Sequence, residues 1–417
     1  MLKRMKKLQE YLNGPESKEF LEYYSGKHFN GSITLIEERE PGTLHFEKGH
    51  VTKVEAGIPQ AGVDLGVDYS KRVWDAFPKA HRSTPAIHTW YSTCADCNIL
   101  GDNPIRNRQF NHTVAHVCRL YSYVREDKAL WSDIQKRDAE VPASNGPVTI
   151  KGFYLRVNGI KVYVETNDAP DDKATIICLH TAGRDNRQYH DMMELFAGKY
   201  KMYTLDMPAH GKSWPLPGNN VIMDYKTYGK WIFDITKALN VENPIYIGCS
   251  MAGGIVYHMA QEYNPRAVVC MQGNDNTVKK TAVAEEWVAM LTHPGNNVAV
   301  TQRELSDSMI GTKTRQSRVD FIRWGVECES GLVKCGDYTE TNNLNVSDKM
   351  DEVTCPVLII EGTDDLTYSA EMAEGSFKRL TNCKNKKLKK IDGYGHFIIV
   401  ENPEKVCEYI DELIQSL

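Results

Sequence analysis

Six short apolar runs, separated by helical stretches, constrain the fold of this chain most strongly. They are ATIICLH (174–180), KMYTLD (201–206), PIYIGCS (244–250), RAVVCMQG (266–273), PVLIIEG (356–362) and LKKIDG (388–393). Runs of this length that alternate with helices are typical of a parallel sheet covered on both faces. Just before them, FYLRVNGIKVYVE (153–165) alternates around Asn158-Gly159, a pair that favours a tight hairpin turn. We therefore predict an α/β domain with a mostly parallel sheet over residues 148–417.

The composition favours a soluble globular protein. Hydrophobic residues make up 41% of the 417 residues and charged residues 25%, which is the balance of ordinary globular domains. The net charge of −5 comes with no basic stripe that could bind phosphates, so we expect no nucleic-acid partner. No apolar run approaches the length of a membrane span. The eleven cysteines are odd in number and scattered, which indicates reduced thiols and a cytoplasmic location.

A change of composition divides the chain. Charged residues give way to Pro, Ala, Ser, Asn and Gly in QKRDAEVPASNGP (135–147), which predicts a linker over residues 136–147 after an N-terminal domain over residues 1–135. A second irregularity lies between the fourth and fifth apolar runs. About eighty residues with helical apolar spacing separate them, too many for an ordinary connection. We expect a helical cap at about 276–350, above the carboxyl edge of the sheet, where open α/β sheets bind ligands.

The N-terminal segment predicts a smaller α+β domain. The basic opening MLKRMKKLQEYL lacks the apolar stretch of a signal peptide, and it predicts a helix with Leu2, Met5 and Leu8 on one face. GTLHFEKGHVTKVEAG (42–57) predicts two strands around Lys48-Gly49. Further residues are expected to be buried because they share a short helix or one helical stripe: Val73, Trp74 and Phe77, then Phe110, Val114, Val117, Tyr121 and Val124.

A lone serine stands among small residues in GCSMAGG (248–254). Ser250 could be an ordinary helix N-cap, or a nucleophile exposed on a sharp strand-to-helix turn. Two later segments offer partners: Asp364 and Asp365 follow the strand-like PVLIIEG, and His396 follows the last run in IDGYGHF (391–397). All of these side chains come after predicted strands, so they should meet at the carboxyl edge of the sheet. A carboxylate that orients a histidine, which in turn activates a serine, is the arrangement that acyl transfer needs.

Five ordered motifs carry a resemblance to the α/β-hydrolase superfamily. They are LHTAG (179–183), DMPAHGKS (206–213), GCSMAGG, GTDD (362–365) and GYGHF (393–397). The resemblance implies Ser250 as nucleophile, His396 as base and Asp365 as the orienting acid, with Asp364 in reserve. It also implies an oxyanion hole made by the backbone N–H groups of Met251 and Ala182.

Several residues depart from these motifs or stand outside the predicted machinery. Thr181 and Ala252 occupy positions where the family commonly has glycine, so Thr181 leaves the identity of the second oxyanion donor open. His210 and Asp206, both in DMPAHGKS, are expected to be structural. The pattern Cys94-x2-Cys97-x14-His112-x3-His116 is close to the ligand spacing of a zinc site, although the two histidines could equally be helix side chains. We expect neither a metal nor an organic cofactor.

Residues 15–132 resemble sterol-carrier-protein-2-like domains, through LHFEKGHVTKVEAG (44–57) and VDLGVDYSKRVWDAF (63–77). This resemblance implies a hydrophobic-ligand role, a cover for the hydrolase site, or dimerisation, which would make the chain a homo-oligomer.

The sequence as a whole predicts a serine hydrolase that cleaves a carboxylic ester or related acyl bond of a small to medium apolar substrate through an acyl-enzyme. Two alternatives stay open. One is a carbon–carbon bond hydrolase that acts on a diketone-like substrate, and the other is a non-catalytic carrier of hydrophobic ligands.

Overall fold

The computed structural model divides the chain into two compact units, Met1–Gln135 and Lys136–Leu417. The structure describes residues 1–15, 17, 28–75, 97–103, 106, 110–129, 137–142, 145–146, 148–167, 169–170, 174–277, 306, 309–365 and 367–417.

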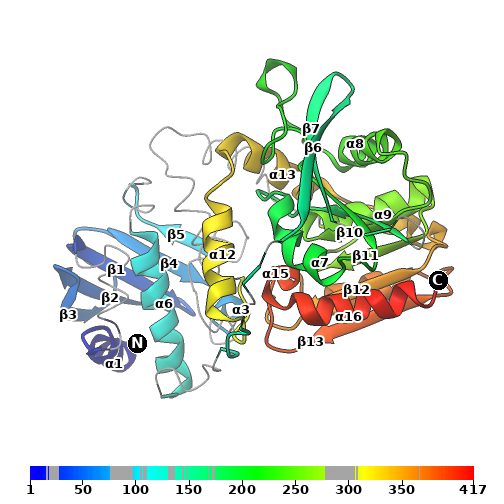
Figure 1. Cartoon of the computed structure of the whole chain (residues 1–417). Helices are drawn as coiled ribbons and strands as arrows, with labels where there is room; N and C mark the ends of the chain where they lie inside the picture. Colours follow the sequence, from blue (N-terminus) through cyan, green and yellow to red (C-terminus); the bar gives the residue numbers. More distant parts are fainter. Residues whose placement is uncertain are drawn as a thin grey trace. The chain divides into compact units, whose positions relative to one another are not determined.

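The second unit is built on an eight-stranded sheet (Figure 1) with the order β13-β12-β11-β10-β8-β9-β7-β6. Its strands are β6 (Ile150–Val157), β7 (Ile160–Asn167), β8 (Thr175–Leu179), β9 (Lys201–Leu205), β10 (Ile245–Cys249), β11 (Ala267–Met271), β12 (Val357–Gly362) and β13 (Lys386–Ile391). The six strands from β8 onward pair in parallel, whereas β6 and β7 join the edge antiparallel. The six apolar runs are therefore the parallel strands, and the predicted α/β fold class is confirmed.

The turn between β6 and β7 also agrees with the sequence. Val157 pairs with Ile160, so the loop contains only Asn158 and Gly159. Both residues have positive φ, 48° and 84°, as the two central positions of the mirror-image hairpin turn require.

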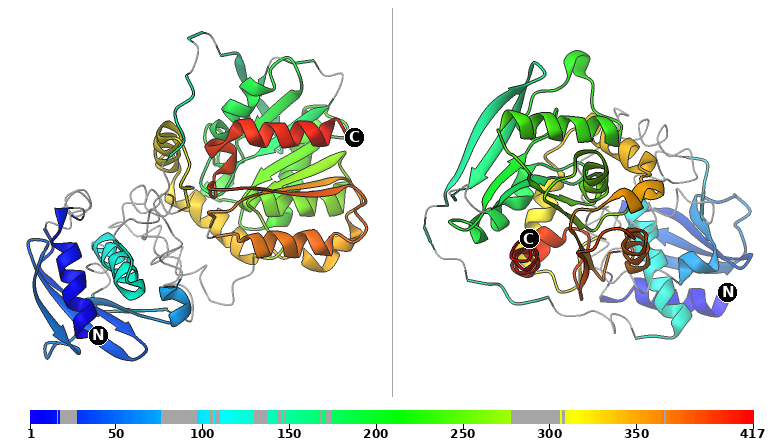
Figure 2. Two further views of the ribbon diagram at one scale, coloured as in Figure 1. Left: turned by 90° about the horizontal axis from the view of Figure 1, so that it is seen from below. Right: turned by 90° about the vertical axis from the view of Figure 1, so that its right-hand side faces the viewer.

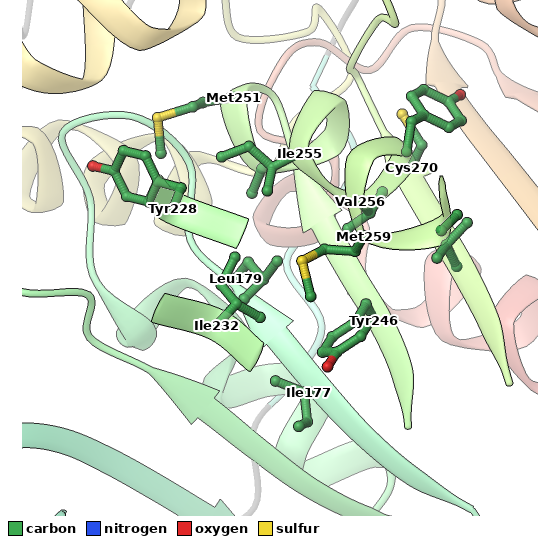
Figure 3. Close-up of a cluster of buried hydrophobic side chains, with 14 of the residues drawn as sticks. Ile177, Leu179, Tyr228, Ile232, Tyr246, Met251, Ile255, Val256, Met259 and Cys270 are labelled. Atoms are coloured by element: carbon green, nitrogen blue, oxygen red, sulfur yellow. The ribbon is translucent and has the colours of Figure 1, made fainter. Parts of the chain in front are cut away.

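Helices cover both faces of this sheet (Figures 1 and 2). They are η3 (Asn186–Tyr189), α7 (His190–Leu195), η4 (Pro217–Asn219), α8 (Tyr225–Ala238), α9 (Met251–Tyr263), α12 (Gln316–Val326), α13 (Gly331–Asn343), η5 (Ser347–Glu352), α14 (Ala370–Arg379), α15 (Ile398–Glu401) and α16 (Pro403–Ile414). Helix α7 packs with α16, and α8 packs with α9. Alternate residues of the strands point to the α8 and α9 side, where Ile177, Leu179 and Tyr246 meet Ile232 and Ile255 in a buried apolar cluster (Figure 3). Because helices cover both faces of the sheet, side chains on both sides of each central strand are buried, which agrees with the continuous apolar runs in the sequence.

The long interval between β11 and β12 contains helices where it is described. Helices α12 and α13 and the short η5 lie within it. Residues 278–305 and 307–308 of the predicted cap lie outside the described residues.

The first unit has a five-stranded sheet with the order β3-β2-β1-β4-β5. Its elements are α1 (Leu2–Leu12), β1 (Gly31–Glu37), β2 (Glu40–Glu47), β3 (His50–Ala56), β4 (Leu65–Tyr69), α3 (Lys71–Trp74), β5 (Cys97–Leu100) and α6 (Asn111–Glu126). Strands β1 and β4 are parallel and the other pairs are antiparallel. Helices α1 and α6 pack against each other (Figure 2) and share one apolar core with the sheet.

Most sequence expectations for this unit are confirmed. Strands β2 and β3 flank Lys48-Gly49, the five-residue stripe from Phe110 to Val124 is buried, and Trp74 is fully buried. The side chain of Val73 and the whole of Phe77 lie outside the described residues. The expected N-terminal helix is present as α1, with Met5 and Leu8 buried and Leu2, at its start, 40% exposed. Met1 takes the inner position instead, because its side chain fills the space beside Gly42 in β2.

Across the described residues of both units, no helix combines the length and the apolar character needed to cross a membrane.

Candidate active site

Ser250 lies on a sharp turn between β10 and α9. Its φ of 59° and ψ of −119° lie in a sparsely populated region that costs on the order of 1–3 kcal/mol and persists only where the surroundings enforce it. A Cβ at Gly248 would lie 2.2 Å from the carbonyl oxygen of Ala252, and one at Gly253 would lie 2.9 Å from that of Met271. The small neighbours are therefore required by close backbone contacts. Ala252 is small enough to stand in the position where glycine is common.

Ser250, His396 and Asp365 form one hydrogen-bonded chain. The Ser250 Oγ lies 2.8 Å from His396 Nε2, and His396 Nδ1 lies 2.7 Å from Asp365 Oδ2. Because the carboxylate can only accept, His396 carries its proton on Nδ1 and accepts the serine proton on Nε2. The other oxygen of Asp365 accepts the Thr367 N–H at 2.7 Å. All three side chains are buried, each at 7% exposure or less.

The reserve candidate, Asp364, is directed elsewhere. Its Oδ2 accepts hydrogen bonds from the N–H and the hydroxyl of Thr312, at 2.9 and 2.7 Å. It holds the segment before α12, and the structure places Asp365 beside the histidine.

Two buried side chains fix the loop that carries His396. Glu401 in α15 accepts the N–H of Gly395 at 2.9 Å and that of Phe397 at 2.8 Å, one on each side of the histidine. Gln272, after β11, accepts the Gly362 N–H and donates to the Gly395 carbonyl at 2.8 Å, which ties together the loops of Asp365 and His396. The backbone around the histidine is thus held by a helix, α15, and by the residue that follows β11.

In the loop after β8, the N–H of Ala182 lies between two backbone N–H groups that are hydrogen-bonded. The N–H of Thr181 donates to Gln188 Oε1 at 3.2 Å, and that of Gly183 donates to Asp337 Oδ2 at 2.6 Å. Among the described residues, the N–H of Ala182 between them has no acceptor. The N–H of Met251 opens helix α9 and so has no acceptor within that helix. These two groups are the ones that the sequence singled out for an oxyanion hole.

Asp337 in α13 is buried and anchors this loop through the N–H of Gly183. Besides Gly183, its carboxylate accepts from His210 Nε2 at 3.0 Å and from the hydroxyl of Tyr228. Burial lowers the pKa of His210, but the Asp337 carboxylate outweighs burial and raises this pKa to about 9. Conversely, burial would raise the pKa of Asp337, but His210 outweighs burial and holds it below the usual range. His210 is thus a charged structural partner, and the sequence around Asp337 gave no signal of its role.

Asp206 is structural, as expected. Its two carboxylate oxygens accept the N–H groups of Asn186 and Lys212, at 2.8 and 2.9 Å. Burial raises the pKa of Asp206 to about 6. It therefore closes the turn of the DMPAHGKS segment.

Of the zinc-like pattern, the structure describes only the side chain of His116. His116 is buried in α6 with its Nε2 3.0 Å from the hydroxyl of Ser17. Cys94 lies outside the described residues, as do the side chains of Cys97 and His112. Within the part of the chain that the structure covers, no group of His, Cys, Asp and Glu is arranged to hold a metal ion.

Two family models match the second unit. Residues 174–299 match a model described as alpha/beta hydrolase fold, and residues 241–403 match one described as BAAT / Acyl-CoA thioester hydrolase C terminal. The second unit belongs to the α/β-hydrolase fold superfamily. The recognition drawn from the five motifs is confirmed.

Individual relatives of this α/β-hydrolase agree with the family models. An (E)-2-((N-methylformamido)methylene)succinate hydrolase of Acinetobacter baylyi is 25% identical over 246 residues, which are 58% of this chain and 90% of that protein. A 3-oxoadipate enol-lactonase of the same organism is 20% identical over 260 residues, covering 60% and 92%. The crystal structure of the enol-lactonase from Burkholderia xenovorans superposes with a TM-score of 0.56 at 12% identity, covering 63% and 99%. Together these findings support a hydrolase of the α/β fold.

Proposed function

We propose that this α/β-hydrolase cleaves a carboxylic ester or related acyl bond of a small to medium substrate through an acyl-enzyme. Ser250 is the nucleophile, His396 the general base and Asp365 the carboxylate that orients it. The observation that carries the proposal is the unbroken hydrogen-bonded chain from the Ser250 hydroxyl through His396 to Asp365. Ser250 lies on a strained turn, and all three side chains follow strands at the carboxyl edge of the sheet.

The geometry suits a two-step reaction. His396 Nε2 takes the proton as Ser250 Oγ attacks the carbonyl, and Asp365 stabilises the resulting imidazolium. The N–H groups of Met251 and Ala182 bind the oxyanion of the tetrahedral intermediate. The leaving group departs with the proton from His396, and an acyl-enzyme remains. Water that His396 deprotonates then attacks the acyl carbonyl and frees Ser250.

The enol-lactonase relative and the family model named for acyl-CoA thioesters favour the same class of bond. The two curated relatives are named for hydrolysing a methylenesuccinate derivative and a 3-oxoadipate enol-lactone. One matching family model is named for acyl-CoA thioesters. Esters, lactones and thioesters share the electrophilic acyl carbon that a serine nucleophile attacks.

A fluorophosphonate probe and two variants test the proposal. We expect the wild-type chain and Ser347→Ala, which alters a serine on η5, to be labelled covalently and to hydrolyse short aryl esters. Ser250→Ala should remain folded, escape labelling and lose at least about 10⁴-fold in kcat. A Ser250→Ala variant that keeps wild-type turnover would disprove the assignment.

The same assay addresses the two alternatives. A carbon–carbon hydrolase would cleave β-diketones faster than aryl esters. A non-catalytic carrier would leave the probe unreacted and hydrolyse neither substrate.

A further inference from the structure

Arg184 is a buried cation beside the proposed active site. It stands two residues after Ala182, and only 6% of its surface is exposed. Its Cζ lies 4.7 Å from the centre of the Phe397 ring, and that ring lies 5.4 Å from the His396 ring. The guanidinium and the catalytic imidazole therefore contact the same aromatic side chain.

The fold makes room for this guanidinium. A Cβ at Gly325 in α12 would lie 2.1 Å from Arg184 Nη1, so glycine at this position leaves the space that the guanidinium fills. A second cation lies close by: Lys334 in α13 is 1% exposed, and its Nζ donates to the carbonyl of Val326. Burial first, and then the charge of Arg184, lower the pKa of Lys334 to about 8.

No acceptor satisfies Arg184 within the described part of the chain, and its Nη2 is buried without a partner. The nearby carboxylates are engaged elsewhere. Asp185 forms an ion pair with Arg187, and Asp337 is shared by His210, Tyr228 and Gly183. Glu329 accepts the N–H of Gly211, and burial raises its pKa to about 7, so it is only partly ionised near neutral pH.

The charge of Asp185 favours the charged form of Arg184, but a buried guanidinium without a hydrogen-bonded carboxylate is costly, and contact with one phenyl ring offsets only part of that cost. An anion placed against Arg184 would complete the site. Among small anionic groups, a carboxylate matches the planar fork of arginine with two parallel hydrogen bonds.

We propose that Arg184 binds a carboxylate carried by the substrate, so that the preferred substrates are esters or lactones with a carboxylate near the scissile carbonyl. This inference rests on the proposed function and narrows the expectation of an apolar substrate to an apolar body with one acidic group. The place of Arg184, two residues from an oxyanion donor, favours a carboxylate over the phosphates of coenzyme A. Those phosphates are separated from the thioester by the long pantetheine arm.

A matched pair of esters tests the proposal. para-Nitrophenyl hydrogen glutarate and para-nitrophenyl pentanoate have acyl chains of equal length, and only the first carries a carboxylate. We expect the wild-type enzyme to prefer the acidic ester by at least about tenfold in kcat/KM. Arg184→Met should lower that preference by about 10–100-fold, mainly through KM, because it removes charge-assisted hydrogen bonds. Gly325→Ala, which displaces the guanidinium without changing any charge, should lower it in the same direction.

Arg187→Met is the control. It removes a cation from the same loop, but one that Asp185 already pairs, so the preference for the acidic ester should stay at the wild-type level. The proposal is overturned if the wild type shows no preference, or if Arg184→Met lowers kcat/KM equally for both esters. Melting temperatures of all variants show whether a loss reflects unfolding.

A binding measurement separates this proposal from the proposed function. Glutarate is titrated calorimetrically into Ser250→Ala and into Ser250→Ala/Arg184→Met. If Ser250→Ala binds glutarate and the double variant does not, the carboxylate site is supported. This holds even if the wild type hydrolyses neither ester and is not labelled by the fluorophosphonate. Equal binding by both, or none by either, rejects the site.

Discussion

The two proposed oxyanion donors are held in place in different ways. Met251 follows the strained turn at Ser250, which is fixed by close backbone contacts within its own strand and helix and by the neighbouring strand β11, whose Met271 carbonyl accepts the Ser250 N–H. Ala182 lies in a loop whose next residue, Gly183, is anchored by Asp337, 154 positions further along the chain. One donor depends on local backbone packing and the other on a side chain from a distant helix.

This difference explains which variants should damage the site and how. The backbone contacts around Ser250 leave no space for a larger side chain, because the atoms are already at van der Waals distance. The hydrogen bond from Gly183 to Asp337 depends on charge and on the placement of α13, so substitutions or pH changes can weaken it partially.

Gly248→Ala should have the largest effect. Its Cβ would lie 2.2 Å from the carbonyl oxygen of Ala252, and backbone cannot move aside as a flexible side chain can. We expect a loss of about 1–3 kcal/mol in the free energy of unfolding. A displaced Ser250 should also lower kcat by about 10²-fold. Urea denaturation and ester hydrolysis measure the two effects.

Gly146→Ala is the control, because a Cβ at Gly146 meets no atom within 4 Å. Wild-type stability and turnover in Gly248→Ala would contradict the account of a locally enforced turn.

Asp337→Asn tests the distant support. The loop keeps a side chain of the same shape at position 337 but loses the charge that pairs with His210, so the Ala182 N–H should be less well placed. We expect kcat to fall by about 10-fold, and by no more than the roughly 10²–10³ that loss of one oxyanion donor costs. Tyr228→Phe removes one donor to Asp337 and leaves Gly183 bound, so its effect on kcat should be smaller. An equal loss in both variants would show that Asp337 does not act through Gly183.

The difference between local and distant contacts also decides which features could be predicted from the sequence. The parallel strands and the Asn158-Gly159 turn follow from local periodicity and turn chemistry, and both are confirmed. The positions of Ser250, Asp365 and His396 after their strands could be predicted because parallel strands end at one edge of the sheet. The contacts of Asp337 and Arg184 could not, because they depend on how α12 and α13 pack onto a loop far away in the chain. For a related reason, helical spacing alone does not show that Met1, rather than Leu2, packs beside Gly42.

The ion pair between His210 and Asp337 should make stability depend on pH. In the folded state the pKa of His210 is raised from 6.5 to about 9. The contribution of its proton to stability is therefore fully present below pH 6.5 and is lost as the pH rises through about 9. His210→Gln should be less stable than the wild type at pH 6, and the difference should shrink towards pH 9. Urea denaturation across this range, with the exposed His50→Gln as control, measures it. A difference that grows with pH would contradict the ion pair.

The smallest expected effect on stability comes from changing the segment before β6. Its composition predicts a linker, whereas its hydrogen bonds join it to residues far along the chain. Composition predicts a linker over residues 136–147, yet part of it is attached to the segment that leads into α12. The N–H of Asp138 donates to the Lys313 carbonyl at 2.8 Å, and the carboxylate of Glu140 accepts the Ser317 N–H at 2.9 Å. We propose that residues 136–417 fold without the N-terminal unit, which then affects substrate range or oligomeric state.

Two truncated proteins, beginning at residues 136 and 148, sharpen this proposal. Both retain Ser250, Asp365 and His396, so the fluorophosphonate should label both. The shorter one loses the Asp138 contact, and a backbone hydrogen bond contributes about 1 kcal/mol. Its melting temperature should therefore be lower by at least about 2–4 °C. Because the lost contacts precede α12, the shorter protein should also hydrolyse esters more slowly at temperatures where both are folded. Equal melting temperatures would show that residues 137–140 contribute nothing to the stability of the second unit and act only as a linker. Aggregation of both truncated proteins would show that the second unit needs the first to fold.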